Sequence, residues 1–83
     1  MECRAVLKLP SRWAEALVKS LEPDNITAPP NVRVECRSAG ELVECTIVVD
    51  CREPRDFLRL RNTVDDLLAN LKAALEALES LET

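Results

Sequence analysis

Histidine and tyrosine are absent from this sequence of 83 residues, which also has one glycine, one tryptophan and one phenylalanine. Without histidine, the chain lacks the most common general base, the usual activator of a nucleophile and the most common metal ligand. A single glycine excludes a Gly-rich loop that cradles phosphate. We therefore expect no enzyme activity of its own, no metal and no cofactor.

Long apolar runs are also absent. None approaches the roughly 20 residues that span a membrane, and the first residues lack the basic and apolar regions of a signal peptide. We therefore expect a cytoplasmic protein. The length fits one domain over residues 1–83. Abundant Leu, Glu and Arg with little Gly is a composition that suits a thermophile, which gives the chain an archaeal-like character.

Charge is distributed unevenly along the chain. Residues 1–62 hold ten basic and ten acidic groups, whereas residues 63–83 hold one basic and five acidic groups. The whole net charge of −4 therefore lies near the C-terminus. This distribution does not fit a simple basic nucleic-acid module, although a local arginine patch is compatible with it.

Three segments have the residue pattern of β-strands. Residues 3–9 and 32–38 alternate polar and apolar side chains with period two. Residues 42–51 form a third strand that is apolar on both faces, and Ala39-Gly40 predicts a tight turn before it.

Two further segments have apolar residues three and four positions apart, which predicts amphipathic helices. The first begins after Ser11, whose hydroxyl can cap it, and ends at Pro23, before a loop over residues 24–30. The second begins near Pro54 and runs almost to the C-terminus. Its predicted core stripe consists of Phe57, Leu60, Val64, Leu67, Leu71, Ala74, Leu78 and Leu81.

The element order β-α-β-β-α predicts an α+β fold. The third strand is the most apolar and is placed in the centre of the sheet. A right-handed crossover then gives a three-stranded antiparallel sheet of order 1-3-2 with two helices on one face.

The four cysteines fall on the predicted core-facing side of their strands. They contain no C-x₂-C pair, which disfavours a zinc site. We favour four buried cysteines acting as small apolar residues. The strand order also places Cys3 beside Cys51, so a Cys3–Cys51 disulfide is geometrically allowed, mainly in a hyperthermophile.

The last helix offers one predicted contact surface. About 27 helical residues span about 40 Å, against about 27 Å for a strand of about eight residues, so the end carrying Leu78 and Leu81 should extend beyond the sheet. On the opposite side, Ala69, Ala73 and Ala77 form a row of small residues that another helix can approach closely. Helix propensity alone would also explain the alanines, and fraying would explain the overhang.

The sheet face without helices offers a second surface. It has an apolar centre within a charged rim, as a homodimer interface can have, or as a solvated sheet with scattered apolar residues has. The central residues are Val6, Leu42, Thr46 and Val48.

Arginines gather in two places, and guanidinium groups suit phosphate. An ion-paired, solvated surface is the alternative. The candidates are Arg33, Arg37, Arg55, Arg59 and Arg61.

Two segments carry a family resemblance: SLEPDN at residues 20–25, and LRNTVDDLL at residues 60–68. With the length and element order, they resemble the Pcc-type small subunit of the KEOPS tRNA-modification complex, a family that includes human cancer/testis-antigen-like proteins. The family usually has alanine and asparagine where this chain has Asn62 and Asp65.

The resemblance implies a non-catalytic scaffold that forms homodimers and binds the N-terminal helices of a large ATP-binding catalytic subunit. That subunit transfers a threonylcarbamoyl group to the adenosine beside the tRNA anticodon. We assign the alanine row with Leu78 and Leu81 to the catalytic subunit, the apolar centre of the open sheet face to the homodimer, and the five arginines to tRNA.

Two other functions remain as alternatives. A free-standing KH-like RNA-binding module would also combine three strands with helices, but the sequence has no Gly-x-x-Gly loop. A small homodimeric domain that binds a small molecule would need a polar pocket, which nothing in the sequence marks.

Overall fold

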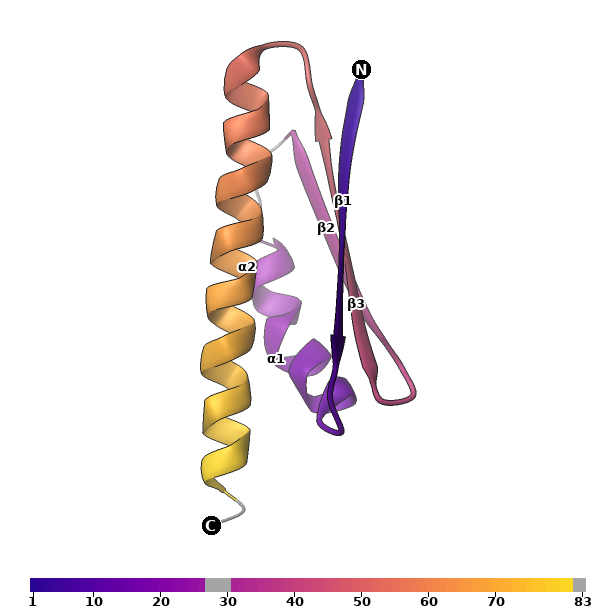
Figure 1. Ribbon diagram of the computed structural model, residues 1–83, viewed down its shortest axis with the longest axis vertical. Coiled ribbons are helices and arrows are strands. Elements are labelled where there is room, and N and C mark those ends of the chain that lie inside the picture. Colours follow the sequence, from indigo (N-terminus) through magenta and orange to yellow (C-terminus); the bar gives the residue numbers. More distant parts are fainter. Residues whose placement is uncertain (27–30, 82–83) are drawn as a thin grey trace.

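In a computed structural model, the described residues are 1–26 and 31–81, except that the side chains of residues 22–26 are not described. The elements are β1 (Glu2–Pro10), α1 (Ala14–Ile26), β2 (Val32–Ala39), β3 (Leu42–Asp50) and α2 (Pro54–Ser80). The strands form one antiparallel sheet in the order β1-β3-β2. Both helices lie on one face of this sheet, and the other face is open (Figure 1). The predicted α+β fold and its strand order are confirmed.

The central strand β3 supplies most of the core. Its core-facing side chains Val43, Cys45, Ile47 and Val49 are buried, because both neighbouring strands and both helices surround them. Their alternation with half-buried residues on the outer face follows from the period of two in a strand. The buried residues of the two helices that pack on this face are Ala14, Leu17, Leu21, Leu67 and Leu71.

The first helix differs from its prediction at both ends. Ser11 does cap its start, because its Oγ accepts a hydrogen bond of 3.0 Å from the Trp13 backbone N–H, but α1 begins only at Ala14. The prediction that Pro23 ends the helix is wrong, since α1 continues through Pro23 to Ile26. A proline biases the preceding residue away from helix without forbidding it. The predicted loop is therefore wrong for residues 24–26, and its remainder, residues 27–30, lies outside the described residues.

The core stripe of α2 is shorter than predicted. Leu67 and Leu71 are buried, and the half-buried residues between Leu60 and Leu78 pack around them. Phe57 and Leu81 are not core residues, because their side chains are 53% and 82% exposed. Both lie at ends of the helix, where it passes the edge of the packed core.

Backbone hydrogen bonds hold both ends of β1. The Cys51 N–H donates to the Met1 carbonyl over 2.7 Å, and the Ser11 N–H donates to the Glu41 carbonyl over 2.8 Å. The hairpin between β2 and β3 is closed by a tight turn at Gly40 and Glu41, one residue later than predicted, and Gly40 has a φ of 62°. A two-residue hairpin needs a positive φ at this position, which glycine adopts without steric cost.

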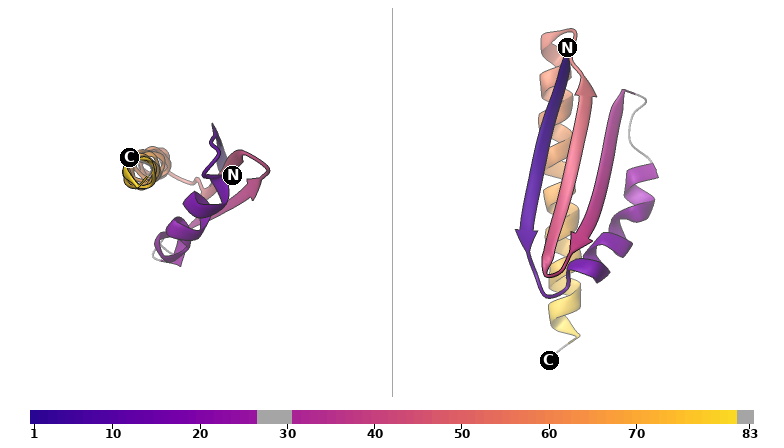
Figure 2. Two further views of the ribbon diagram at one scale, coloured as in Figure 1. Left: turned by 90° about the horizontal axis from the view of Figure 1, so that it is seen from below. Right: turned by 90° about the vertical axis from the view of Figure 1, so that its right-hand side faces the viewer.

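The two edges of the sheet have different surroundings. Figure 2 shows β1 at one edge with no element beyond it, whereas α1 lies on the side of β2. The second helix lies over β1 and β3. The inner side chains of β1 are only half-buried, because α1 does not reach this side.

Candidate interaction surfaces

The start of α2 holds a buried carboxylate. Asp56 is 7% exposed and accepts hydrogen bonds from the backbone N–H groups of Arg52, over 2.8 Å, and Glu53, over 3.0 Å. These bonds hold the pKa of Asp56 below its ordinary value, opposed by partial burial and aided by nearby Arg59 and Arg55. A carboxylate here also favours the positive end of the helix. Asp56 therefore has a structural role, because its carboxylate caps the start of α2.

The alanine row is an exposed strip of α2. Ala69, Ala73 and Ala77 all face away from the core. At 100° per residue they lie roughly opposite the buried Leu71. The five residues predicted to bind a catalytic subunit therefore do not share one face of α2. Leu78 packs against the core, whereas the three alanines and Leu81 are exposed.

The open face of the sheet contains all four predicted homodimer residues. Val6 is 50% exposed, and Leu42, Thr46 and Val48 are half-buried. Charged side chains surround them in cross-strand rows. Lys8 and Arg37 flank Glu44 in one row, with Arg37 bonded to Glu44 over 3.0 Å. The apolar centre is therefore narrow, one or two residues wide in each row.

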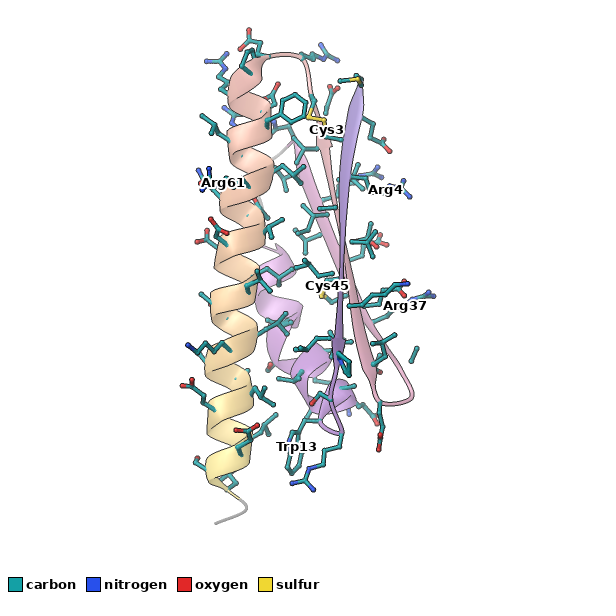
Figure 3. The ribbon with its side chains drawn as sticks, in the orientation of Figure 1. Cys3, Arg4, Trp13, Arg37, Cys45 and Arg61 are labelled. Carbon is teal, nitrogen blue, oxygen red and sulfur yellow. A yellow bond between two sulfur atoms is a disulfide. The ribbon has the colours of Figure 1, made fainter. Side chains whose placement is uncertain are left out.

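The predicted tRNA-binding arginines do not form one surface. Arg33 and Arg37 lie on the open face of the sheet, whereas the other three lie on α2. Figure 3 shows Arg37 on the side of the sheet away from the helices and Arg61 pointing away from the sheet. Strand and helix place them on opposite sides of the molecule.

Most of these arginines are ion-paired. Arg33 lies 3.8 Å from Glu2, Arg55 contacts Glu53, and Arg59 lies 3.8 Å from Asp56. Within the described part of the chain, Arg61 makes no ion pair. Arg61 is therefore the candidate that can bind a phosphate without first breaking an ion pair with a carboxylate.

All four cysteines are paired, contrary to the interpretation of four reduced, buried cysteines. One disulfide joins Cys3 to Cys51, the pairing that the strand order allows, and the other joins Cys36 to Cys45 across the β2–β3 hairpin. The second pair was missed, although a two-residue turn that pairs Ala39 with Leu42 also sets Cys36 opposite Cys45. Their Cα atoms are 4.0 Å apart.

A second feature missed from the sequence is an exposed apolar flank on α2. Phe57 and Leu68 are 53% and 47% exposed. Helical geometry places both about 40–60° to the same side of Leu71, together with the half-buried Leu75. The angle of Leu68 on the helical wheel was the available signal in the sequence, but only the exposed fractions in the structure show that the flank is uncovered.

Two structural observations bear on other functions. No group of His, Cys, Asp and Glu side chains suited to a metal ion occurs among residues 1–26 and 31–81. In the same part of the chain, neither helix is long and apolar enough to cross a membrane.

Comparison with known proteins places the fold. No family model matches the sequence, and no curated protein matches it. Among solved structures, the chain is similar to one in the crystal structure of the binary Gon7–Pcc1 complex, with a TM-score of 0.76 and 24% identity over 95% of both chains. The chain therefore shares the fold of a protein in this complex, in agreement with the fold expected from the Pcc-type resemblance of the sequence.

Proposed function

We propose that this chain is a non-catalytic scaffold subunit of a KEOPS complex, acting in the cytoplasm. It would dimerise, bind the catalytic subunit and so support threonylcarbamoylation of tRNA. The observation that carries the proposal is the fold shared over 95% of the chain with the Gon7–Pcc1 structure. The Pcc-type segments at residues 20–25 and 60–68 support it independently.

In this proposal, α2 receives a helix of the catalytic subunit on its alanine row. Ala69, Ala73 and Ala77 are exposed and small, so a second helix can pack close to the α2 backbone. The bare Leu81 would extend this contact beyond the sheet, and Leu78 would support the helix from the core side.

The test is co-purification with the cognate catalytic subunit. We expect Ala73→Arg to abolish co-purification, because a long charged side chain prevents close helix packing. The matched control is Glu79→Arg, which adds an arginine about 120° away around the same helix and should leave binding intact. Binding by Ala73→Arg, or loss by both variants, would refute the assignment of the alanine row.

Because Arg33 and Arg37 lie on the opposite side of the molecule from Arg61, the five arginines would not bind one tRNA segment together. Of the five, Arg61 would contribute most to tRNA binding, because it has no ion pair in the described part of the chain. Loss of one phosphate contact lowers the salt dependence of binding by about one unit of slope. We therefore expect Arg61→Ala to reduce tRNA binding by the assembled complex at low salt and to flatten its salt dependence. An unchanged slope would remove Arg61 from the tRNA surface.

A KH-like RNA-binding module gains no support from the structure. Arg33 and Arg37, the candidate arginines on the open sheet face, already contact carboxylates, so this face offers nucleic acid little free positive charge at these two residues. The scaffold role remains the conclusion that the observations support best.

A further inference from the structure

The first strand is the element least anchored in the core. Among the side chains that the structure describes, each of the other four elements contributes at least one buried residue, whereas β1 contributes none. Its inner side chains are only half-buried, and it pairs with a single neighbour, β3. Segments with few buried apolar contacts open locally at a lower free energy than the whole domain unfolds. We therefore expect β1 to be the strand that separates most readily from the sheet.

Two anchors limit how far β1 can move. At its C-terminal end, the Ser11 N–H donates to the Glu41 carbonyl, and the Ser11 hydroxyl caps α1. At its N-terminal end, a disulfide joins Cys3 to Cys51, and the Cys51 N–H donates to the Met1 carbonyl over 2.7 Å. Because Cys51 directly follows β3, this disulfide ties the free end of β1 to the strand with which it pairs.

The two disulfides differ in what holds their cysteines together once the S–S bond is broken. Cys36 and Cys45 lie opposite each other within the β2–β3 hairpin, with paired residues on both sides. Cys3 lies near the end of β1, and Figure 3 shows it at the end of the sheet, beside the first turns of α2. Reduced Cys36 and Cys45 therefore stay adjacent and re-form their bond readily, whereas reduced Cys3 can move away from Cys51.

We propose that the Cys3–Cys51 disulfide is a redox-controlled latch on β1. In the oxidised form, β1 is held at both ends. Reduction by a dithiol, from a protein or a small molecule, frees its N-terminal end and lets β1 separate from β3, while the β2–β3 hairpin and both helices remain folded. This inference concerns the chain alone and goes beyond the proposed function.

The reduction is a two-electron thiol–disulfide exchange. A thiolate of the dithiol attacks Sγ of Cys3, the half-buried partner, because Cys51 is only 4% exposed. The S–S bond breaks, and Cys51 leaves as a thiolate that takes up a proton. The second thiol of the reductant loses its proton and attacks the mixed disulfide, which releases Cys3 as a thiolate that also takes up a proton. The dithiol becomes a disulfide, and both cysteines become thiols.

Loop closure determines the size of the effect. When β1 separates with the latch intact, residues 3–11 form a loop that is fixed at both ends. Without the disulfide, the same residues form a tail that is fixed only at Ser11. Removing a cross-link that closes a loop of about nine residues favours the open form roughly 50- to 100-fold. The hairpin disulfide lies outside this loop, so its removal leaves the opening of β1 unchanged.

Separation of β1 has a distinct signature along β3. The two backbone hydrogen bonds at the ends of β1 set the alternation of the ladder, so the odd-numbered amides of β3 donate to β1. The even-numbered amides of β3 then donate to β2. Opening of β1 therefore exposes the amides of Ile47 and Val49 but not those of Thr46 and Val48.

Hydrogen exchange of the isolated chain tests the latch. Cys3→Ala and Cys36→Ala form a matched pair, because each replaces the half-buried cysteine of one disulfide and keeps its buried partner. We expect Cys3→Ala to speed exchange of the odd-numbered β3 amides roughly 50- to 100-fold, and Cys36→Ala to leave them unchanged. In Cys3→Ala, these amides should also exchange faster than the even-numbered ones. Equal acceleration by the two variants, or equal exchange of odd and even amides in Cys3→Ala, would overturn the proposal.

The order of reduction gives a second test on the wild-type protein. The folded chain is titrated with dithiothreitol, free thiols are alkylated, and mass spectrometry locates them. Cys3 and Cys51 should be alkylated at lower dithiothreitol concentrations than Cys36 and Cys45. If the hairpin pair is reduced first, or both pairs together, β1 is not released separately and the latch is refuted. Neither experiment involves the catalytic subunit, so their failure is distinct from a failure of the proposed function.

Discussion

The two disulfides provide an internal comparison of loop length. Cys3–Cys51 closes a loop over a sequence separation of 48, and Cys36–Cys45 closes one over a separation of 9. In the chain-entropy description, the first stabilises the fold by about 4 kcal/mol at 25 °C and the second by about 2.6 kcal/mol. Each pair has one buried and one half-buried cysteine. The packing lost on replacement by alanine is therefore similar for the two pairs. A difference in stability between the two double variants then measures the difference in loop-closure entropy.

We expect Cys3→Ala/Cys51→Ala to lower the free energy of unfolding by about 1.5 kcal/mol more than Cys36→Ala/Cys45→Ala. For a domain of this length, that difference is about 6–12 °C in Tm. The assay is urea denaturation at one fixed protein concentration, because dimerisation would also change the apparent stability. Thiol titration of the unfolded wild type should find no free thiol.

Two results would refute this reasoning. If removal of the hairpin disulfide costs as much as removal of the long-range one, loop closure does not control the stability. If a reductant leaves the unfolding of the wild type unchanged, the bonds do not contribute to the folded state.

Three further changes test the core and the helix cap. Leu71→Asp should lower the free energy of unfolding by more than about 3 kcal/mol and abolish cooperative melting, because it places an unpaired charge at a buried site. Leu81→Asp, at an 82% exposed site, should change it by no more than about 0.5 kcal/mol, and circular dichroism melts compare the two. The lowered pKa of Asp56 stabilises the fold above the ordinary carboxyl pKa, and this contribution is lost as the pH falls through the folded-state value. Asp56→Asn should therefore lower Tm at pH 7 and reduce the loss of Tm on acidification; an identical pH profile would refute the role of this carboxylate.

Periodicity predicted the sheet because each strand has one buried face. The apolar residues on both faces of residues 42–51, together with the crossover rule, predicted that β3 lies in the centre, as the structure shows. The rule that a proline ends a helix failed at α1, where tertiary packing determines how far the helix extends. Pro23 lies inside α1, two residues after the buried Leu21, although a proline there was expected to end the helix.

The interaction surfaces were less predictable than the fold. Helical spacing assigns Leu68 and Phe57 to one side of the core stripe, but it cannot show that this side stays exposed in the fold. The arginines illustrate the same limit. Arg37 and Arg61 appear in two sequence clusters, and only the arrangement of sheet and helix shows that they point to opposite sides of the molecule.

The sheet order has a consequence for folding kinetics. The β2–β3 hairpin needs only the two-residue turn at Gly40, so its contacts are local and form early. Pairing of β1 with β3 must close the chain between Pro10 and Leu42 first, which costs loop entropy. During synthesis β1 therefore emerges first yet pairs only after its partner strand β3 has been made, so this edge strand joins the sheet after the β2–β3 hairpin has formed.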